Sequence, residues 1–232
     1  MGERLKPSKE TIKKALEILN SGGTVVIPTN TNYNVVCDYQ NLDAVKKVFM
    51  AKERTKFGPL TLYLKSSKEI PLYTFPTAGF NHELADRLWP TEISFILLKR
   101  PIIADLVTCG TPTIALACHD HPVLQQILSE FGRPICGSSA NISGQGDIHV
   151  DFGKAQSDLA NRVDLLIDDG PTKAELSQIL EKSNTIVDFT FDPPFLVRKG
   201  FFHESSLRKI VPNVQFDPEQ YHSLVKNRTL SQ

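Results

Sequence analysis

Short, almost continuously apolar runs separated by amphipathic segments constrain the fold of this chain most. Residues 24–27 (TVVI), 93–98 (ISFILL) and 113–118 (TIALAC) are runs of this kind. A strand that is apolar on both faces is usually buried on both faces, with helices covering the sheet on either side. Between such runs, residues 8–19 and 42–49 carry apolar side chains at helical spacing. The pattern predicts an α/β fold.

Further elements of both kinds continue this alternation. Additional strands are predicted at 60–64, 134–139, 163–168, 184–190 and 195–200, and additional helices at 81–89, 122–131 and 151–161. The last three strands follow one another without helices, so the sheet must be partly antiparallel. We therefore expect a single domain with a twisted, open, mixed sheet flanked by helices. It should span residues 1–200, and a polar C-terminal extension at 201–232 should be peripheral.

Charge and cysteine usage limit the kinds of partner and compartment. Lys plus Arg and Asp plus Glu both number 26, so no overall field would attract nucleic acid or an anionic membrane. No apolar run approaches the ~18 residues of a membrane span, and the charged N-terminus lacks a signal-peptide core. The four cysteines form no Cys-x-x-Cys pair and are expected to be reduced. These features favour a soluble, cytoplasmic protein.

Polar segments follow three of the apolar strands. They are Pro-Thr-Asn-Thr-Asn-Tyr at 28–33, Gly-Ser-Ser-Ala-Asn-Ile-Ser-Gly at 137–144 and Arg-Lys-Gly at 198–200. Hydroxyl groups, amides and backbone N–H groups at strand ends are how α/β proteins bind polar ligands. Ser, Asn and Gly also favour ordinary turns, so any one segment alone would be weak support for a site. Three together, with the cationic segment Ala-Lys-Glu-Arg at 51–54, predict a ligand site.

The order of these segments resembles that of the YrdC family. The matching stretches are GGTVVIPTNTNY, AKERTKFGPL, DHPVLQQIL, GSSANISG, TIVDFT and VRKG, from about Gly22 to Gly200. The resemblance implies a YrdC-like fold and a nucleotidyltransferase that forms L-threonylcarbamoyl-adenylate from threonine, bicarbonate and ATP, for threonylcarbamoyladenosine modification of tRNA. It also includes the less well understood YciO group. Possible partners it implies are tRNA and downstream modification proteins.

The resemblance also implies site residues. It assigns ATP to Lys52, Arg54, Ser94, Ser139, Asn141 and Arg198, and the amino acid to Thr31, Tyr33 and Asn184. It assigns no catalytic residue, and Mg²⁺ would arrive with the ATP and be held largely by phosphates. Without the resemblance, the pattern at Lys52 and Arg54 is typical of a solvated helix end. Ser139 and Asn141 are then interpreted as an ordinary turn, and Arg198 as an arginine paired at the surface.

A metal site is not expected. His119-Asp120-His121 is the nearest candidate, but on a strand Asp120 would point away from both histidines. The resemblance makes Asp-His-Pro the start of a helix instead.

Departures from the family pattern fall on the amino-acid side. Asn30 replaces an acidic residue, Asn34 a Gly, Tyr63 a His, Ala117 an Arg and Asn184 a Ser. Trp-Pro-Thr-Glu-Ile-Ser at 89–94 replaces Trp-Pro-Gly-Pro-x-Thr, which makes Thr91 and Glu92 unusual. Losing the Arg removes a natural partner for a substrate carboxylate. The acceptor therefore stays open between threonine and another molecule.

Three hypotheses for the function remain. One is threonylcarbamoyl-adenylate synthesis, and a second is synthesis of a related carbamoyl- or acyl-adenylate from another acceptor. The third is a non-catalytic nucleotide- or RNA-binding YciO-like protein, in which a cationic set would face the phosphate backbone. That set is Lys46, Lys47, Lys52, Arg54 and Lys56. The neutral net charge argues against strong non-specific RNA binding.

Overall fold

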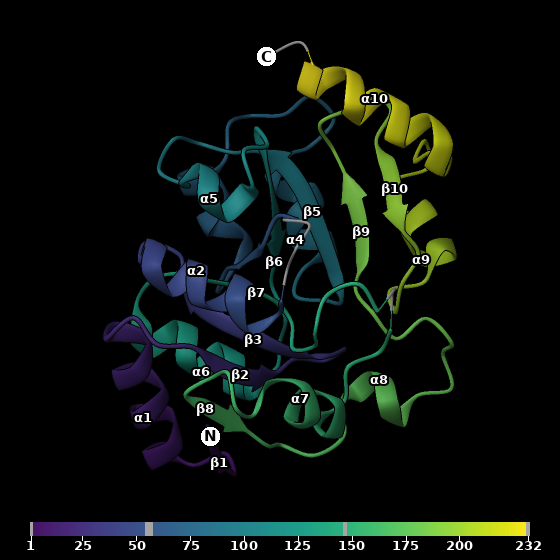
Figure 1. Ribbon diagram of the computed structural model, residues 1–232. Coiled ribbons are helices and arrows are strands. Elements are labelled where there is room, and N and C mark those ends of the chain that lie inside the picture. The colour runs from purple at the N-terminus through teal and green to yellow at the C-terminus, as the bar shows by residue number, and fades with distance from the viewer. Residues whose placement is uncertain (1, 54–57, 146–147, 231–232) are drawn as a thin grey trace.

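The computed structural model describes residues 2–53, 58–145 and 148–230 (Figure 1). The strands in this part of the chain are β1 (Glu3–Leu5), β2 (Val25–Pro28), β3 (Tyr33–Asp38), β4 (Thr61–Tyr63), β5 (Ile93–Leu98), β6 (Thr113–Ala117), β7 (Ile135–Ser139), β8 (Leu165–Ile167), β9 (Thr185–Asp188) and β10 (Phe195–Arg198). They form one sheet in the order β1-β8-β2-β3-β7-β4-β6-β5-β9-β10. Parallel pairs such as β4 with β6 alternate with antiparallel pairs such as β3 with β7, so the predicted mixed sheet is confirmed.

Helices cover both faces of this sheet. The longer ones are α1 (Lys9–Asn20), α2 (Leu42–Ala51), α4 (His82–Leu88), α6 (Pro122–Phe131), α7 (Phe152–Leu159) and α10 (Pro218–Leu230). Shorter ones are the 3₁₀ helix η1 (Ser67–Glu69) and the helices α3 (Ile70–Tyr73), α5 (Asp105–Thr108), α8 (Lys173–Leu176) and α9 (Glu204–Arg208). As predicted, Ser8 caps α1: its hydroxyl accepts a hydrogen bond from the Thr11 N–H at 3.1 Å.

Two apolar clusters, one on each face, explain why the strands are apolar throughout. Val25 and Ile27 of β2 pack in one cluster with α1 and α6, and Val26 between them packs in the other with α2. Successive side chains of a strand point to opposite faces, so each β2 residue meets one helical layer or the other. The continuous run TVVI is therefore the expected signature of a two-sided sheet.

The hairpin at residues 25–38 differs from expectation, because no strand was predicted after Pro28. Pro28 is the last residue of β2, and it lies opposite Tyr33, the first residue of β3. The strand was missed because Asn34 interrupts its apolar pattern. The amide of Asn34 is buried and donates to Thr29 Oγ1 at 3.2 Å and to the Asn32 carbonyl oxygen at 3.0 Å. Internal hydrogen bonding thus allows a polar side chain inside a buried strand.

Two smaller elements were also missed. The edge strand β1 is three residues long and largely polar, so its sequence carries no strand pattern, and it pairs in parallel with β8. The last three strands are not consecutive, since α8 lies between β8 and β9. Thr172 and Glu175 form a capping box for this four-residue helix.

The segment after residue 200 packs against the edge of the sheet that β10 forms. Leu207, Val211 and Val214 are buried in the larger apolar cluster. Helix α10 lies beside β10 (Figure 1), and the Tyr221 hydroxyl donates to Asp188 Oδ2 at 3.0 Å. The division of the chain at residue 200 stays a prediction.

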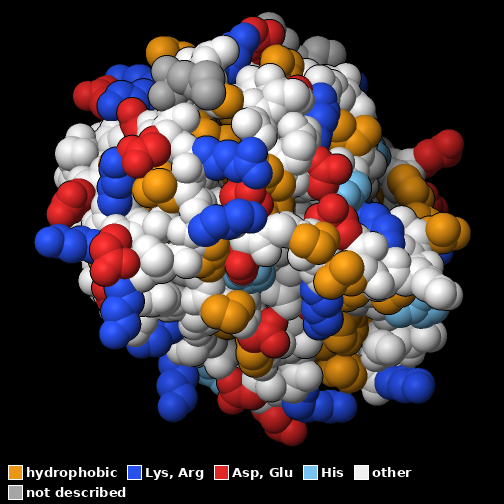
Figure 2. Space-filling model, turned by 90° about the horizontal axis from the view of Figure 1, so that it is seen from below, with side chains coloured by type: hydrophobic (Ala, Val, Ile, Leu, Met, Phe, Trp, Pro, Cys, Tyr) orange, Lys and Arg blue, Asp and Glu red, His pale blue; other side chains and the backbone are white. Residues whose placement is uncertain are grey.

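Surface charge is mixed on the face shown in Figure 2. Lys and Arg side chains alternate there with Asp and Glu side chains, and no broad area of one sign stands out. This agrees with the balanced composition. In the part of the chain that the structure describes, no helix combines the length and the apolar character that a membrane span needs.

Candidate functional site

Polar side chains from six strands and their connections enclose a cavity of about 330 Å³. The residues that line it are Thr31, Asn32, Asn34, Pro59, Thr61, Tyr63, Ser94, Ser138, Ser139, Ile148, Ser183, Asn184, Ile186 and Arg198. We call it the central cavity. Five residues predicted from the sequence line it: Thr31, Ser94, Ser139, Asn184 and Arg198.

The pairing of β3 with β7 brings two of the sequence segments together. Asn34 lies opposite Ser139, and Val35 lies opposite Ser138, in this antiparallel pair. The Ala140 N–H also donates to the Tyr33 carbonyl oxygen at 2.9 Å. In an antiparallel pair, the start of one strand lies beside the end of the other. The Pro-Thr-Asn-Thr-Asn-Tyr turn before β3 and the Gly-Ser-Ser-Ala-Asn loop after β7 therefore meet at the same end of this strand pair.

Asn184 contacts three other residues that line the central cavity, and also His119 behind them. Its Oδ1 accepts from the Thr31 hydroxyl at 2.7 Å, and its Nδ2 donates to Ser94 Oγ at 3.2 Å and to His119 Nε2 at 2.8 Å. Its backbone carbonyl oxygen accepts from Arg198 Nε at 2.9 Å. Both Nδ2 hydrogens have partners, so this amide is held in one orientation.

His119 was not predicted as a functional residue. It is fully buried, and burial lowers the pKa of its imidazole to about 4. Because Nε2 accepts from Asn184, the neutral ring carries its hydrogen on Nδ1, which is buried and has no partner among the described residues. The Tyr63 ring centre lies 6.1 Å from the imidazole centre. The sequence marked this residue only as part of a rejected metal-site candidate, because its contact with Asn184, 65 residues away, cannot be read from local pattern.

Lys52 holds the Ser-x-Asn loop and is itself only 3% exposed. Its ammonium donates to the carbonyl oxygens of Ser139 and Asn141, the latter at 2.8 Å, and to Asn141 Oδ1 at 3.3 Å. The Lys52 carbonyl oxygen accepts from the Ser143 N–H at 2.8 Å. Ser139 Oγ donates to Asn141 Oδ1 at 2.7 Å. The structure thus brings three predicted nucleotide residues together. Arg54 and Lys56 lie outside the described residues.

Tyr33 does not line the central cavity. Its ring packs edge-on against Phe152 with centres 5.3 Å apart, and its hydroxyl donates to the Gly170 carbonyl oxygen at 2.7 Å. Burial raises the pKa of this phenol, so it stays neutral. The structure therefore places Tyr33 in the core, where it supports the turn that carries Thr31.

The central cavity is lined by one arginine and by no described acidic side chain. Among its described lining residues Arg198 is the only one with an ionised side chain, since burial also raises the pKa of the Tyr63 phenol. Hydroxyl and amide groups make up most of the remaining lining. A single cation surrounded by many hydrogen-bond donors suits an anionic, oxygen-rich ligand.

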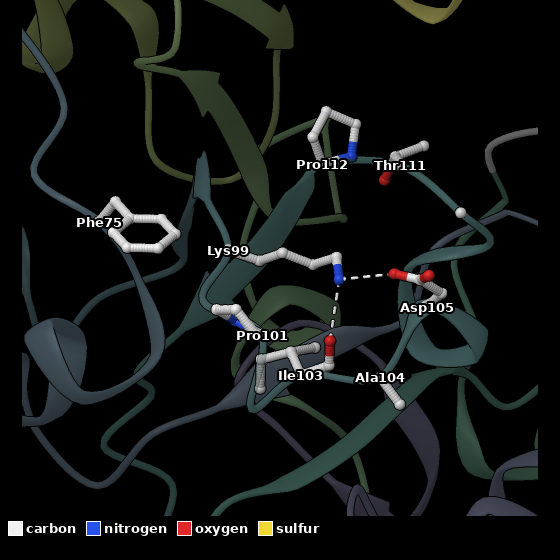
Figure 3. A pocket seen from close by; sticks show the side chains of 9 residues that line it. Phe75, Lys99, Pro101, Ile103, Ala104, Asp105, Thr111 and Pro112 are labelled. Atoms are coloured by element: carbon white, nitrogen blue, oxygen red, sulfur yellow. Dashed lines mark hydrogen bonds and ion pairs between the residues drawn. The ribbon is translucent and has the colours of Figure 1, made fainter. Parts of the chain in front are cut away.

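A larger cavity of about 600 Å³ lies elsewhere and contains none of the sequence motifs. It sits where β5 ends and β6 begins, at the end of that pair remote from Ser94 and Ala117. Figure 3 shows its central side chain, Lys99, bound to the Ile103 carbonyl oxygen at 2.9 Å and to Asp105 Oδ1 at 2.8 Å. The Asp105 carboxylate offsets the charge of this lysine.

Metal-binding side chains are not gathered at either place. Within residues 2–53, 58–145 and 148–230, no group of three or more His, Cys, Asp or Glu residues could hold a metal ion. His121 is the N-cap residue of α6 and Pro122 its first residue, as the resemblance implied.

These features define an α/β domain that carries a polar, cationic cavity where the strands of its single mixed sheet end. The chain belongs to the Sua5/YciO/YrdC family: the family's model, described as "Telomere recombination", matches residues 17–200. The resemblance inferred from the sequence is thereby confirmed.

Three relatives show the extent of the similarity. The threonylcarbamoyl-AMP synthase of Bacillus subtilis is 28% identical over 93% of this chain and 60% of its own length. The crystal structure of P. abyssi Sua5 complexed with L-threonine has a TM-score of 0.83 at 25% identity, and covers 95% of this chain and 63% of that one. E. coli YciO has a TM-score of 0.74 at 25% identity over 87% of this chain and 97% of that one. The chain spans about 60% of the length of the first curated relatives that it matches.

Proposed function

We propose that this protein is a nucleotidyltransferase that forms L-threonylcarbamoyl-adenylate, or a close analogue, from ATP, bicarbonate and an amino acid. The observation that carries the proposal is the joining of Lys52, Ser139 and Asn141 in one loop beside the cavity that Arg198 lines. Relatives named threonylcarbamoyl-AMP synthase, and a relative crystallised with L-threonine, support the choice of reaction.

The nucleotide would lie along the Ser-x-Asn loop. Ser139 presents a hydroxyl to the cavity, and the buried ammonium of Lys52 adds positive charge to the same loop. Arg198, which also lines the cavity, adds a second cation. A carbamate oxygen would attack the α-phosphate of ATP and expel pyrophosphate, and these groups would offset the developing negative charge.

Mg²⁺ would accompany the triphosphate. No Asp or Glu occurs among the described residues that line the central cavity, so phosphate oxygens would supply most of its ligands. An adenylate of this kind is unstable in water. We therefore expect a downstream protein to use it to modify tRNA in the cytoplasm.

A second candidate is a related adenylate made from another acceptor. The amide of Asn184 is already committed to Thr31, Ser94 and His119, and Ala117 offers no charge to a carboxylate. Both features alter the half of the cavity that the resemblance assigns to the amino acid.

Pyrophosphate release in the presence of ATP and bicarbonate, across a panel of amino acids, tests the proposal. Arg198→Gln should lower the rate at least tenfold. Arg208→Gln, which removes an arginine of α9 paired with Glu204, serves as the matched control and should leave the rate unchanged. Failure of the parent to bind ATP or to release pyrophosphate with any acceptor would refute the proposed function.

A further inference from the structure

A third cavity, of about 220 Å³, lies where α3 and the segment after it meet the end of β5. Two backbone hydrogen bonds join these parts of the chain: the Phe75 N–H donates to the Leu98 carbonyl oxygen at 2.9 Å, and the Arg100 N–H donates to the Tyr73 carbonyl oxygen at 2.8 Å. The cavity shares no lining residue with the central cavity, whose Ser94 lies at the other end of β5. We call it the α3 cavity.

Arg100 is the only described residue of the α3 cavity whose side chain is permanently charged. Its Nε donates to the Thr74 carbonyl oxygen at 2.9 Å, and its guanidinium carbon lies 4.9 Å from the Phe75 ring centre. No described residue accepts a hydrogen bond from its two terminal nitrogens. A guanidinium that is fixed at Nε and stacked on a ring presents its remaining N–H groups to a carboxylate in a set geometry.

Other arginines of the chain show which partner such a side chain finds. Four of them pair with a carboxylate of the protein itself: Arg4 with Asp168, Arg133 with Asp38, Arg162 with Glu53 and Arg208 with Glu204. Arg133 is the closest comparison, because its guanidinium also lies over a phenylalanine ring, 3.8 Å from the centre of Phe131. Among the described residues, no carboxylate pairs with Arg100, and none lines the α3 cavity. The position that Asp38 takes beside Arg133 is thus open beside Arg100.

The other walls of the α3 cavity are largely apolar. They include Ile70, Pro71, Phe75 and Phe80. Phe75 is 44% exposed, and it also lines the larger cavity shown in Figure 3. The α3 cavity is smaller than the roughly 300–1,000 Å³ of a site for a drug-sized ligand, so it suits a single branched or aromatic group.

We propose that the α3 cavity binds a carboxylate that carries a branched or aromatic apolar group. The carboxylate accepts hydrogen bonds from the terminal nitrogens of Arg100, and the apolar group packs on Phe75 and Phe80. A neutral apolar molecule would leave the guanidinium without a partner, and a small anion such as acetate would leave the apolar walls exposed to water. An apolar carboxylate satisfies both. The inference does not depend on the proposed function, because the two cavities have no lining residue in common.

The same chemistry occurs in a free organic acid and in the last residue of a polypeptide. Leu72, beside Pro71 of the lining, is 61% exposed, and Ile102, two residues after Arg100, is 56% exposed. A polypeptide could cover such neighbouring apolar side chains, whereas a small acid would fill the cavity alone. The two sources therefore differ in the affinity that they predict for a peptide.

Saturation-transfer NMR and calorimetry with two pairs of probes test the proposal. 4-Methylpentanoate and an N-acetylated tripeptide that ends in leucine should both bind saturably. Their carboxamides should bind at least about tenfold more weakly, because they lack the charge that pairs with the guanidinium. Tighter binding of the tripeptide, by about tenfold or more, would identify a polypeptide end as the ligand, and similar affinities would identify a free acid.

Two variants and a matched control locate the site. Arg100→Gln should weaken binding of both acids at least about tenfold. Arg87→Gln makes the same change of charge at an exposed arginine of α4 that does not line the cavity, and it should leave binding unchanged. Thr77→Phe should block binding by filling the cavity while keeping Arg100 in place. It tests the site even if Arg100→Gln lowers the stability of the protein.

Three results would overturn the inference. They are equal binding of each acid and its amide, absence of binding by both acids, and unchanged binding in Arg100→Gln and Thr77→Phe. Loss of acid binding in Arg198→Gln but not in Arg100→Gln would place the carboxylate in the central cavity and would overturn it as well. If the acids bind in an Arg100-dependent way but no pyrophosphate is released with any acceptor, the proposed function fails and the α3 cavity stands.

Discussion

Lys52 donates hydrogen bonds to both oxygens of Asn141, to the backbone carbonyl oxygen at 2.8 Å and to Oδ1 at 3.3 Å. With the further bond to the Ser139 carbonyl oxygen, all three ammonium hydrogens have acceptors in the loop. The lysine therefore holds the loop in shape as well as supplying charge.

Lys52→Met should loosen the Ser-x-Asn loop. It removes three hydrogen bonds and leaves the two backbone carbonyl oxygens without the lysine donor, which we expect to lower the free energy of unfolding by about 1–3 kcal/mol. If the main role is positioning, the affinities for AMP and ATP should fall by the same factor. A loss that grows with phosphate number would instead indicate direct phosphate contact. Hydrogen exchange of amides 139–143 should quicken in this variant and stay slow in Lys46→Met, which alters an exposed lysine paired with Asp43.

Asn184→Ser should change both stability and acceptor choice. The shorter side chain cannot reach Thr31, Ser94 and His119 together, so we expect a loss of about 1–3 kcal/mol in the free energy of unfolding. It should also widen the central cavity and raise pyrophosphate release with bulkier amino acids relative to glycine. Asn161→Ser, at an exposed position, should do neither. An unchanged amino-acid preference would show that Asn184 does not shape the acceptor subsite.

Asn30→Asp should destabilise the fold in a pH-dependent way. It places a third carboxylate between Glu92 and Asp120 and removes the amide that bridges them. Mutual repulsion should raise the pKa of this group, so the loss, about 2 kcal/mol, should be largest near pH 8 and shrink near pH 5. Thermal melts of parent and variant at the two pH values measure it. A deficit that is constant with pH would contradict the proposed crowding of charge.

His119 should make the parent protein less stable in acid. Its pKa falls from 6.5 to about 4 because it is buried, so the unfolded chain binds a proton between these values and the folded protein does not. The contribution is present above pH 6.5 and is lost as the pH falls toward 4, on the order of 3 kcal/mol in total. His119→Gln should flatten the stability profile in this window, and exposed His82→Gln should not. Equal profiles for parent and His119→Gln would contradict this account.

Gly137→Ala tests the close approach of β7 to β3. An added Cβ would clash with the Val35 carbonyl oxygen and lie 2.7 Å from Val36 Cγ1, so the strands would have to separate. We expect a loss of more than about 2 kcal/mol from the free energy of unfolding. Gly153→Ala is the control. It lies in α7, where the nearest atom is 3.4 Å away, and it should stabilise the protein by up to ~1 kcal/mol. Similar melting temperatures for both variants would show that the strand contact is looser than described.

Periodicity predicted most of the fold, and motif order selected Lys52, Ser139 and Asn141, which the structure brings together. Their binding of a nucleotide stays a prediction. The runs at 93–98 and 113–118 are β5 and β6 almost to the residue, because buried strands have an unambiguous apolar pattern. Strand β3 was missed because the polar Asn34 is satisfied by contacts that local pattern does not show. The contacts of His119 with Asn184 and of Glu92 with Lys173 were missed for the same reason: the partners lie 65 and 81 residues apart in sequence.

The central cavity draws its walls from strands that are far apart along the chain. The hydrogen bond between Thr31 and Asn184 spans 153 residues, and Arg198 follows later still. During synthesis, a chain that has emerged only as far as residue 144 has the Ser-x-Asn loop but lacks the cavity walls that β9 and β10 supply. Ligand binding should therefore appear late and in one step, when β9 and β10 join the sheet edge. Retention on a nucleotide resin would then separate finished chains from incomplete ones, and nucleotide would protect the whole sheet against proteolysis rather than one part of it.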